Sequence, residues 1–480
     1  MNSPSLKPRR ERDGPIYLQL CRRYRDAIAN GKLRPGDRVP SVRSLASELN
    51  LARGTVELAY QTLISEGYFL TRGPAGTFVS PRLESLGGYR HTSAIRRSAT
   101  KVAPASQPLF AEPLPFQLGL PALDAFPYKT WARLAGRGLR TLSSAAMGYP
   151  DPTGYEPLRR AIATYLGISR GIECSYEEVF VTIGYRGALD LVCRTLLQAG
   201  DLGWHEDPGY IFARQFLESA GMRLAPMPVD EEGLNVDIGQ RRAPHARFVV
   251  VTPTHQSPTG VALSLPRRLA LLEWVRQRKG WIVEDDYDSE FRYHGPPLPA
   301  LKSLDRDGRV LYTGTFSKVL FPGLRLAYLV VPKPQVGRFI ATASHLPGPG
   351  SILAQATVAD FMEQGHFARH LRKMRLLYAT RRGHLVDALT QAFGSHLQVQ
   401  PQAGGIHVLA NLNDRRDDKA LAYAAQSRGL AVQALSDWQT RRTSHGGLLM
   451  GFTNIREPGM ARTLTRQLMN ATETDRTLRR

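Results

Sequence analysis

The stretch GTFSKVLFPGLR, Gly314–Arg325, places one lysine, Lys318, behind small hydroxyl residues at the end of an apolar run. Arg325 follows seven positions later, beyond a Pro-Gly pair. A solvated surface segment would show a different pattern. A lysine amine can form a Schiff base with a carbonyl cofactor only where other groups hold that cofactor beside it. The rest of the chain must then supply those groups.

Three further groups are needed if the cofactor is pyridoxal phosphate (PLP): a carboxylate at the ring nitrogen, a donor at the ring oxygen, and cations or amides at the phosphate. The run WIVEDDYDSEF is an apolar strand that ends in acids, so Asp285 is expected at the carboxyl edge of a parallel sheet, where ligands bind. Tyr287, two residues on, could share its face because side chains alternate along a strand. Ser317 and Arg325 offer a hydroxyl and a permanent positive charge for the phosphate.

Each of these residues also has an ordinary structural explanation. The acid cluster EDDYD around Asp285 could be a solvated loop or a metal site. Tyr287 could be a packing residue, Lys318 a surface lysine, and Arg325 the partner of an acid. The order and spacing of the four favour the cofactor site.

Three regions follow from the distribution of apolar residues. From Pro113 onward, β-rich runs such as RFVVVTP, WIVED, RVLYTG and LAYLVVP alternate with helical stretches such as LPRRLALLEWVRQRKG. This alternation predicts an α/β domain with a mostly parallel sheet over residues 113–480. Residues 81–112 are rich in Pro, Ser, Ala and Arg without sustained periodicity, which predicts a flexible linker. Residues 1–80 form a separate, mostly helical unit.

Composition limits the class of protein. At 480 residues the chain is too long for one ordinary core, and its 42% hydrophobic and 22% charged residues are typical of a soluble globular protein. The 63 basic and 42 acidic residues give a net charge of +21, which suggests a polyanionic partner, with nucleic acid as the first candidate.

Cellular location is indicated by what the sequence lacks. The N-terminus has no apolar signal region, and no stretch reaches the roughly 20 apolar residues of a membrane span. The three cysteines, Cys21, Cys174 and Cys193, have no metal-ligand spacing and leave one unpaired, which favours a reducing compartment. We therefore expect a cytoplasmic protein with no metal site and no membrane partner.

The N-terminal unit has the pattern of a helix-turn-helix. Two short amphipathic helices are predicted on either side of the turn NLAR, with Ser41 available to cap the first. The expected buried positions are Val42, Leu45, Ala46 and Leu49 in the first helix, and Val56, Ala59, Tyr60, Leu63 and Ile64 in the second. The following YFLTRGPAGTFV, two β runs around a Gly/Pro turn, predicts a wing.

The second helix opens with Arg53, Gly54 and Thr55, the position that enters a major groove in this motif. Residues 1–80 hold 13 Lys or Arg against 7 Asp or Glu, which also fits phosphate binding. The alternative is a dimerisation module on which Arg43, Arg53 and Arg72 are only solvated surface residues. The complete motif favours DNA binding.

The segments PIYLQL, LRPGDRVPSVRSLA, LARGTVELAYQTLISEGY and GTFV resemble the GntR-type winged helix-turn-helix. In that family DNA is contacted by the arginine of the first motif helix, by the arginine and threonine that open the recognition helix, and by the wing glycine. The resemblance implies that Arg43, Arg53, Thr55 and Gly76 contact a double-stranded DNA operator.

From roughly Leu114 to the C-terminus the chain resembles class I aminotransferases of fold type I. The motifs are MGYPDPTGYEPLRRAIATYL, EDPGY, TPTHQSPTG, EDDYDSEFRY and GTFSKVLFPGLRLAY. With the winged helix ahead of it, the whole resembles the MocR/GabR-type branch of GntR regulators. The implied fold is an α/β PLP-dependent transferase large domain with a smaller α+β subdomain, preceded by an N-terminal winged helix-turn-helix.

The resemblance also implies roles for single residues in a head-to-tail homodimer. PLP would be held by Lys318 through a Schiff base, with Asp285 at the pyridine nitrogen and Tyr287 at the phenolic oxygen. Ser317 and Arg325 would hold the phosphate. Two further tyrosines complete the set: Tyr149, which would reach the phosphate from the other subunit, and Tyr210, which would stack on the ring or pack in the core.

Two departures from the family pattern concern the same site. The phosphate-facing turn reads TIGYRGALDL, so Tyr185 and Arg186 replace the expected small polar residues and Gln, although backbone amides there could still hold a phosphate. Ser257 stands where aminotransferases carry Asn, which weakens the case for efficient transamination. For an effector carboxylate, the loose candidates are Arg214, Arg441 and Arg442, which plain surface charge explains better.

These observations lead to the hypothesis of a dimeric, PLP-dependent transcriptional regulator that senses a small amine or amino acid. The first alternative is a working aminotransferase with an accessory DNA-binding domain. The second is a protein that has lost PLP and uses the large fold only for dimerisation. The set Asp285, Tyr287, Lys318 and Arg325 argues against the second, and Ser257 with the attached DNA reader argues against the first. At most weak or partial transaminase activity is expected.

Overall fold

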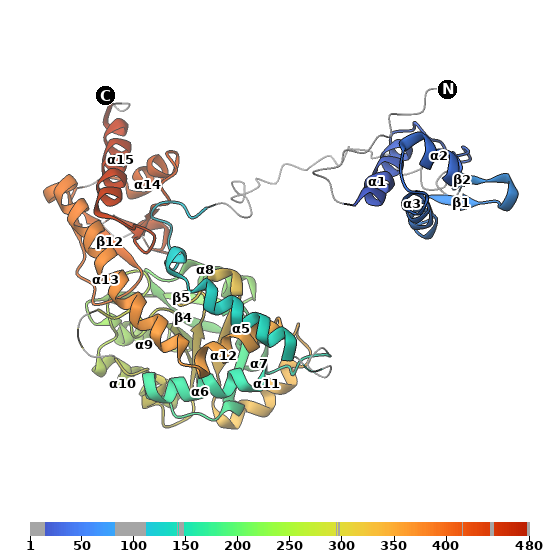
Figure 1. Cartoon of the computed structure of the whole chain (residues 1–480). Helices are drawn as coiled ribbons and strands as arrows, with labels where there is room; N and C mark the ends of the chain where they lie inside the picture. Colours follow the sequence, from blue (N-terminus) through green and yellow to red (C-terminus); the bar gives the residue numbers. More distant parts are fainter. Residues whose placement is uncertain are drawn as a thin grey trace. The chain divides into compact units, whose positions relative to one another are not determined.

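The computed structural model describes residues 15–81, 112–141, 143, 148–293, 295, 298–414, 416–441 and 446–477, the side chains of 472–477 excepted. The chain divides into two compact units, Met1–Pro108 and Leu109–Arg480 (Figure 1). Nearly all of the linker predicted at 81–112 lies outside the described residues. Among the residues that are described, no helix is long and apolar enough to cross a membrane.

The N-terminal unit is a winged helix-turn-helix. Its elements are α1 (Ile16–Ala29), α2 (Val42–Leu49), α3 (Arg53–Ser65), β1 (Phe69–Thr71) and β2 (Thr77–Val79). The two strands pair antiparallel to form the wing. The predicted cap is present, because the Ser41 hydroxyl accepts a hydrogen bond of 3.1 Å from the Ser44 amide at the start of α2. A small apolar core joins all three helices to the wing through residues such as Tyr24, Tyr60 and Phe69.

One expected core position is wrong, and another, Val42 of α2, is only partly buried against the core. Val56, Ala59, Tyr60 and Leu63 of α3 are buried, but Ile64 is 37% exposed. It lies next to Leu63 near the C-terminal end of the helix, past the residues that face the core. The apolar spacing of the sequence extended the buried face by one residue too many.

The centre of the large unit is an eight-stranded sheet within the described residues. Its order is β3 (Val179–Ile183), β10 (Leu326–Val330), β9 (Val310–Thr315), β8 (Trp281–Asp286), β7 (Phe248–Val251), β4 (Leu202–Asp207), β5 (Arg223–Asp230) and β6 (Gly233–Leu234). Strands β9, β8, β7, β4 and β5 are parallel, while β10 runs antiparallel to both of its neighbours and β6 antiparallel to β5. The predicted mostly parallel sheet is thus confirmed.

Alternate residues of each strand face opposite layers of helices, because side chains alternate along a strand. On one face, residues such as Val283 and Leu311 pack with α7 (Gly184–Leu196), α8 (Ile211–Ser219) and α11 (Val336–Ala343). On the other face, residues such as Ile282 and Val310 pack with α9 (Val236–Arg242) and α10 (Leu265–Arg278). The strands are buried on both sides, which explains their continuous apolar runs.

A further helical layer and a small subdomain complete the large unit. The helices α5 (Tyr128–Thr141), α6 (Glu156–Arg170), α12 (Ile352–Glu363) and α13 (His366–Phe393) pack together, with α12 in contact with the other three (Figure 1). A four-stranded antiparallel sheet follows, in the order β11 (Leu397–Val399), β12 (His407–Leu412), β14 (Gly447–Gly451) and β13 (Gln433–Ala434). Its helices are α14 (Asp418–Gln426) and α15 (Pro458–Thr477). The predicted smaller α+β subdomain is therefore present.

Candidate functional site

A cavity of about 370 Å³ lies where the parallel strands end, between the large sheet and the small subdomain. This size is within the usual range of small-molecule sites. Six of the seven residues predicted to hold a cofactor line it: Lys318, Asp285, Tyr287, Ser317, Arg325 and Tyr210. The residues at which the sequence departs from the family pattern, Tyr185, Arg186 and Ser257, line it as well. The structure therefore brings segments from distant parts of the chain into one site.

The Lys318 amine is held by a backbone carbonyl from the start of the large unit. Its Nζ donates a hydrogen bond of 3.0 Å to the Gly119 oxygen. The segment that carries Gly119 is tied to the small subdomain, because the Gly451 amide of β14 donates to the Phe116 oxygen at 2.8 Å. Burial lowers the pKa of the Lys318 ammonium, while the nearby Asp288 and Asp285 carboxylates act in the opposite direction. Loss of the proton, which an amine needs before it acts as a nucleophile, is therefore favoured.

The Asp285 carboxyl enters the cavity because of its place in β8. It lies on the face shared with Val283, two residues earlier, toward the start of α7. Burial raises the pKa of the Asp285 carboxyl to about 8. The nearby Tyr185 hydroxyl acts in the opposite direction, although it forms no hydrogen bond with Asp285. Asp285 forms no ion pair with any described residue. A buried carboxyl without a cationic partner is a group that a ligand can stabilise.

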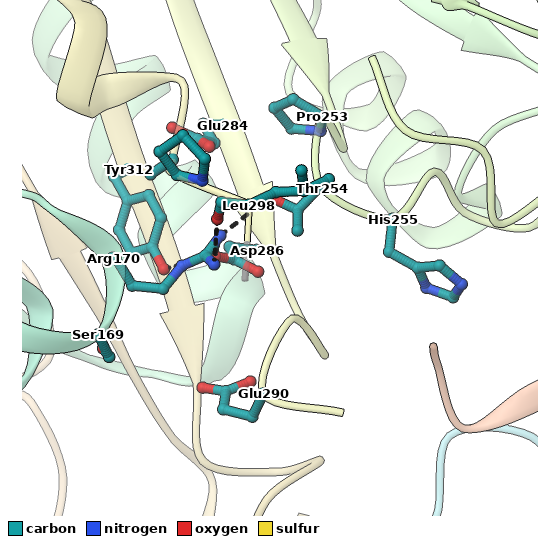
Figure 2. A network of polar contacts seen from close by, with 12 residues as sticks. Ser169, Arg170, Pro253, Thr254, His255, Glu284, Asp286, Glu290, Leu298 and Tyr312 are labelled. Atoms are coloured by element: carbon teal, nitrogen blue, oxygen red, sulfur yellow. Dashed lines mark hydrogen bonds and ion pairs between the residues drawn. The ribbon is translucent and has the colours of Figure 1, made fainter. Parts of the chain in front are cut away.

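The neighbouring Asp286 points to the opposite face of β8 and is fully partnered. Figure 2 shows the Arg170 guanidinium at this carboxyl, with an ion-pair distance of 2.6 Å. The same guanidinium donates to the Leu298 oxygen and to the Thr254 hydroxyl, both at 2.9 Å. Tyr312 donates to Asp286 at 2.7 Å. Asp286 thus belongs to the interior, which leaves Asp285 as the carboxyl of the cavity.

Neither of the two ordinary explanations of the acid cluster, a solvated loop or a metal site, is supported by the described residues. Glu284, Asp285, Asp286 and Asp288 are all buried, so EDDYD is not a solvated loop. No group of three or more His, Cys, Asp or Glu side chains that could hold a metal ion occurs within the described part of the chain. The cluster instead separates its acids between the cavity and the interior by strand alternation.

Tyr287 is oriented by two residues that the sequence analysis did not select. The His255 Nδ1 lies 3.1 Å from the Asp288 Oδ1 and 3.0 Å from the Tyr287 hydroxyl. Because a carboxylate only accepts hydrogen bonds, His255 Nδ1 is the donor of this pair. The Tyr287 oxygen can share that proton, which frees its own O–H to donate into the cavity. His255 lies within the motif TPTHQSPTG and Asp288 within EDDYDSEFRY, but nothing in the sequence singled out either residue.

One part of the cavity wall is cationic. The Arg325 guanidinium lies beside the first turn of α7, where a Cβ added to Gly184 would be 3.5 Å from the Arg325 Cζ. Gly184 has φ +68°, a conformation that favours glycine. Arg325 forms no ion pair or side-chain hydrogen bond with any residue in the described ranges. A helix N-terminus, a free guanidinium and the Ser317 hydroxyl together make an anion site.

The small subdomain closes the cavity with residues that the sequence analysis missed. These are Ile406, His407, Gln433 and Trp438, with Leu118 beside them. The Gln433 Oε1 accepts a hydrogen bond of 3.1 Å from the Trp438 Nε1. Tyr210 joins this wall, with its ring centroid 6.0 Å from that of Trp438. No motif marked these residues, because only tertiary packing brings them to the strand ends.

The remaining candidates lie outside the cavity. Tyr149 is fully exposed and does not line it. Arg214 donates to the Thr440 hydroxyl at 2.8 Å, and the Arg441 amide donates to Asp207 at 3.1 Å, so neither arginine is placed at the cavity. Arg442 lies outside the described residues.

In the N-terminal unit, the candidate DNA contacts lie at the start of the motif helices and on the wing. Arg53 is the first residue of α3 and is exposed, with Thr55 half-buried in the same turn. Arg43 is exposed in the first turn of α2. Gly76 lies in the turn of the wing with φ +105°, and a Cβ there would be 3.1 Å from the Arg38 Nε. This arrangement leaves the arginines free to contact a partner.

Two family models match the chain in succession. Residues 16–79 match the gntR family of bacterial regulatory proteins, and residues 122–446 match aminotransferase class I and II. Among solved structures, the fold is similar to kynurenine aminotransferase from Pyrococcus horikoshii in complex with PMP, with a TM-score of 0.68 and 26% identity over 76% of this chain and 92% of that one. LysN, an α-aminoadipate aminotransferase from Thermus thermophilus, gives a TM-score of 0.68 and 29% identity over 76% and 93%.

Relatives that share both units are transcriptional regulators by name. The probable rhizopine catabolism regulatory protein MocR of Rhizobium meliloti is 37% identical over 93% of this chain and 92% of its own. The pyridoxine biosynthesis regulator PdxR of Corynebacterium glutamicum is 34% identical over 91% and 92%. The chain therefore belongs to the MocR-type GntR regulators, in which a winged helix-turn-helix precedes an aminotransferase class I and II domain.

Proposed function

We propose that the protein is a PLP-dependent transcriptional regulator that binds an operator through its winged helix and senses an amino compound in the cavity. One observation carries the cofactor assignment. The cavity is lined by a carboxyl, Asp285, and a guanidinium, Arg325, that form no ion pair with any described residue, and by the Lys318 amine. A molecule with a basic ring nitrogen, an aldehyde and a phosphate matches all three.

The residues that would hold PLP follow from these positions. Asp285 would hold a proton at the ring nitrogen, Tyr287 would donate to the ring oxygen, and Lys318 would bond to the aldehyde carbon. Ser317, Arg325 and the amides that open α7 would bind the phosphate, and Tyr210 would lie against the ring. When bound, the cofactor supplies an electrophilic carbon that exchanges one amine for another.

The chain's own groups prepare this exchange. Burial lowers the pKa of the Lys318 ammonium, so the amine is more readily released as a free base when another amine takes its place. Gly119 offers a carbonyl that accepts a hydrogen bond from the released amine. The cavity is thus suited to binding an amine reversibly, which is what a sensor requires.

The winged helix supports the second half of the proposal. Arg43, Arg53 and Thr55 would contact the DNA from the two motif helices, and Gly76 would let the wing approach the backbone. We further propose a homodimer, in which the fully exposed Tyr149 reaches the phosphate site of the partner subunit. A regulator that binds operator DNA would act in the cytoplasm.

The set of Lys318, Asp285 and Tyr287 also supports a second candidate, catalytic transamination. Ser257 in place of the family Asn argues for weak turnover at most. A direct test is a product assay beside an operator-binding assay on one sample of the holoprotein. Accumulation of carbonyl product over many turnovers, with operator affinity unaffected by the amine, would favour the enzyme.

A further inference from the structure

We propose that the cavity selects an amine whose neighbouring carbons carry hydroxyl groups, rather than an α-amino acid. This inference rests on the proposed function, because it takes Lys318 as the point where the amine reacts. It concerns the wall that the small subdomain adds, and that wall has a different chemistry from the rest of the cavity.

Positive charge is confined to two places among the described residues that line the cavity. One is Lys318, the amine that the ligand would replace. The other is the first turn of α7, where Arg325 and Arg186 are found. The Arg186 guanidinium lies over the Phe212 ring, with 5.5 Å between its Cζ and the ring centroid. Both charges are near enough to the Tyr210 hydroxyl to lower its pKa. We assign both arginines to the phosphate of the proposed cofactor, and the described lining residues of the small subdomain add no further cation for a carboxylate.

His407 gives the wall a neutral hydrogen-bond acceptor. Burial, together with the nearby His255 and Lys318, lowers the pKa of His407 to about 4, so the ring is neutral at neutral pH. The His407 Nε2 lies 3.0 Å from the Pro258 oxygen. A carbonyl oxygen only accepts, so Nε2 carries the proton and Nδ1 has a free lone pair.

Gln433 gives the same wall a neutral donor. Its Oε1 is occupied by the Trp438 Nε1, and its amide nitrogen has no hydrogen-bond partner among the described residues. Trp438 and Tyr210 add aromatic faces against which a carbon skeleton can pack. One donor, one acceptor and two rings form a surface suited to hydroxyl groups, which donate and accept at once.

A carboxylate would be at a disadvantage on this wall. It cannot donate to the His407 Nδ1, and its charge would be moved from water to a place without a cation. Sites built to hydrogen-bond a hydroxyl discriminate strongly against analogues that leave their polar groups unpaired. The candidates Arg214 and Arg441, which would have supplied the missing charge, do not line the cavity.

Three small amines with one skeleton separate these possibilities: serinol, serine and isopropylamine. Serinol carries two hydroxymethyl groups, L- and D-serine each replace one of them by a carboxylate, and isopropylamine has neither group. Titration of the PLP-loaded full-length protein at one pH, followed by the cofactor absorbance and corrected for the fraction of free amine, gives a Kd for each. We expect serinol to bind at least about tenfold more tightly than either serine or isopropylamine.

A variant of Gln433 and a matched control test whether this side chain causes the preference for serinol. Gln433→Leu is expected to remove most of the advantage of serinol over isopropylamine, because leucine cannot donate to a hydroxyl. The variant also loses the bond from the Trp438 Nε1, but that loss affects all of the amines alike. Gln391→Leu, an exposed glutamine on α13, serves as the matched control and is expected to change nothing.

Several results would overturn the inference. These are serine binding as tightly as serinol, an unchanged preference in Gln433→Leu, or no response to any of the amines in protein that carries the cofactor on Lys318. Protein that carries no cofactor on Lys318 would contradict the proposed function itself, and peptide mass spectrometry after borohydride reduction distinguishes that case.

Discussion

The two units of the chain place their functional charges in opposite ways. The arginines of the N-terminal unit, Arg43 and Arg53, are exposed at helix starts around a small apolar core. The large unit keeps Asp285 and Lys318 in a cavity at the end of a sheet buried on both faces. An exposed cation adds little to stability, so its removal mainly affects binding. A buried unmatched carboxyl destabilises the free protein until a ligand neutralises it.

The largest effect should come from removing the Lys318 amine. In Lys318→Ala no covalent attachment of PLP is expected, because no other amine of the described residues lies at Gly119. Borohydride reduction followed by peptide mass spectrometry measures the attachment. Without added amine, operator affinity should stay within about twofold, because Lys318 lies outside the unit that carries the candidate DNA contacts. Lys333→Ala, an exposed lysine, should retain the label, and a label in Lys318→Ala would show that the site is misassigned.

The second prediction concerns pH and Asp285. Burial raises the pKa of the Asp285 carboxyl from its ordinary value of 3.8 to about 8 in the folded, cofactor-free protein. The folded protein therefore binds this proton more tightly than the unfolded chain does. The unfolding free energy therefore falls as pH rises from about 4 to about 8. Asp285→Asn removes this contribution and should stabilise the cofactor-free protein at pH 8 by roughly 1–3 kcal/mol, while weakening PLP binding.

Denaturant unfolding across that pH range tests the sign. Glu206, whose burial raises its pKa to about 7, contributes in the same direction and remains in the variant, so the slope should be reduced rather than abolished. A slope identical to that of the natural protein would show that Asp285 does not titrate as its burial requires.

A smaller change is expected for the exposed arginines of the N-terminal unit. Arg53→Ala should weaken operator binding by about 1–3 kcal/mol if the guanidinium contacts a guanine, with relaxed specificity at one base pair. Its unfolding free energy should hardly change. Competition between specific and random duplexes measures the effect, and Arg22→Ala on α1 is the exposed control. Equal affinity of the unmodified protein for both duplexes would refute DNA reading by this unit.

The smallest effect concerns the helix that presents Arg43. Ser41→Ala removes the hydroxyl that accepts from the Ser44 amide, and should lower the stability of the N-terminal unit by about 1 kcal/mol. Ser47→Ala, exposed within the same helix, should have less than half that effect. Thermal unfolding, together with hydrogen exchange of the α2 amides, measures the loss of stability in each of the two variants. Equal losses would mean that the cap contributes nothing of its own.

The sequence indicated the parts of the fold that local patterns determine. It placed Asp285 at the carboxyl edge of the parallel sheet, where the residue lines the cavity, and the apolar periodicity of α2 agrees with its buried face. The sequence pattern wrongly included Ile64 in the buried face of α3. His407, Gln433 and Trp438 could not be predicted, because their position depends on how the small subdomain packs against the strand ends. Tyr149 could not be placed from one chain, since its proposed role requires a partner.

The central claim is that amine binding in the cavity changes DNA binding by the winged helix. The direct measurement is the operator affinity of the PLP-loaded protein, with and without an amine that shifts the cofactor absorbance. The amine must bind two arrangements of the protein with different affinity, and such coupling is usually about 1–3 kcal/mol, or 5–150-fold. We predict a change of that size, absent in Lys318→Ala. An unchanged operator affinity, with many turnovers of carbonyl product per site, would contradict the claim and favour an aminotransferase.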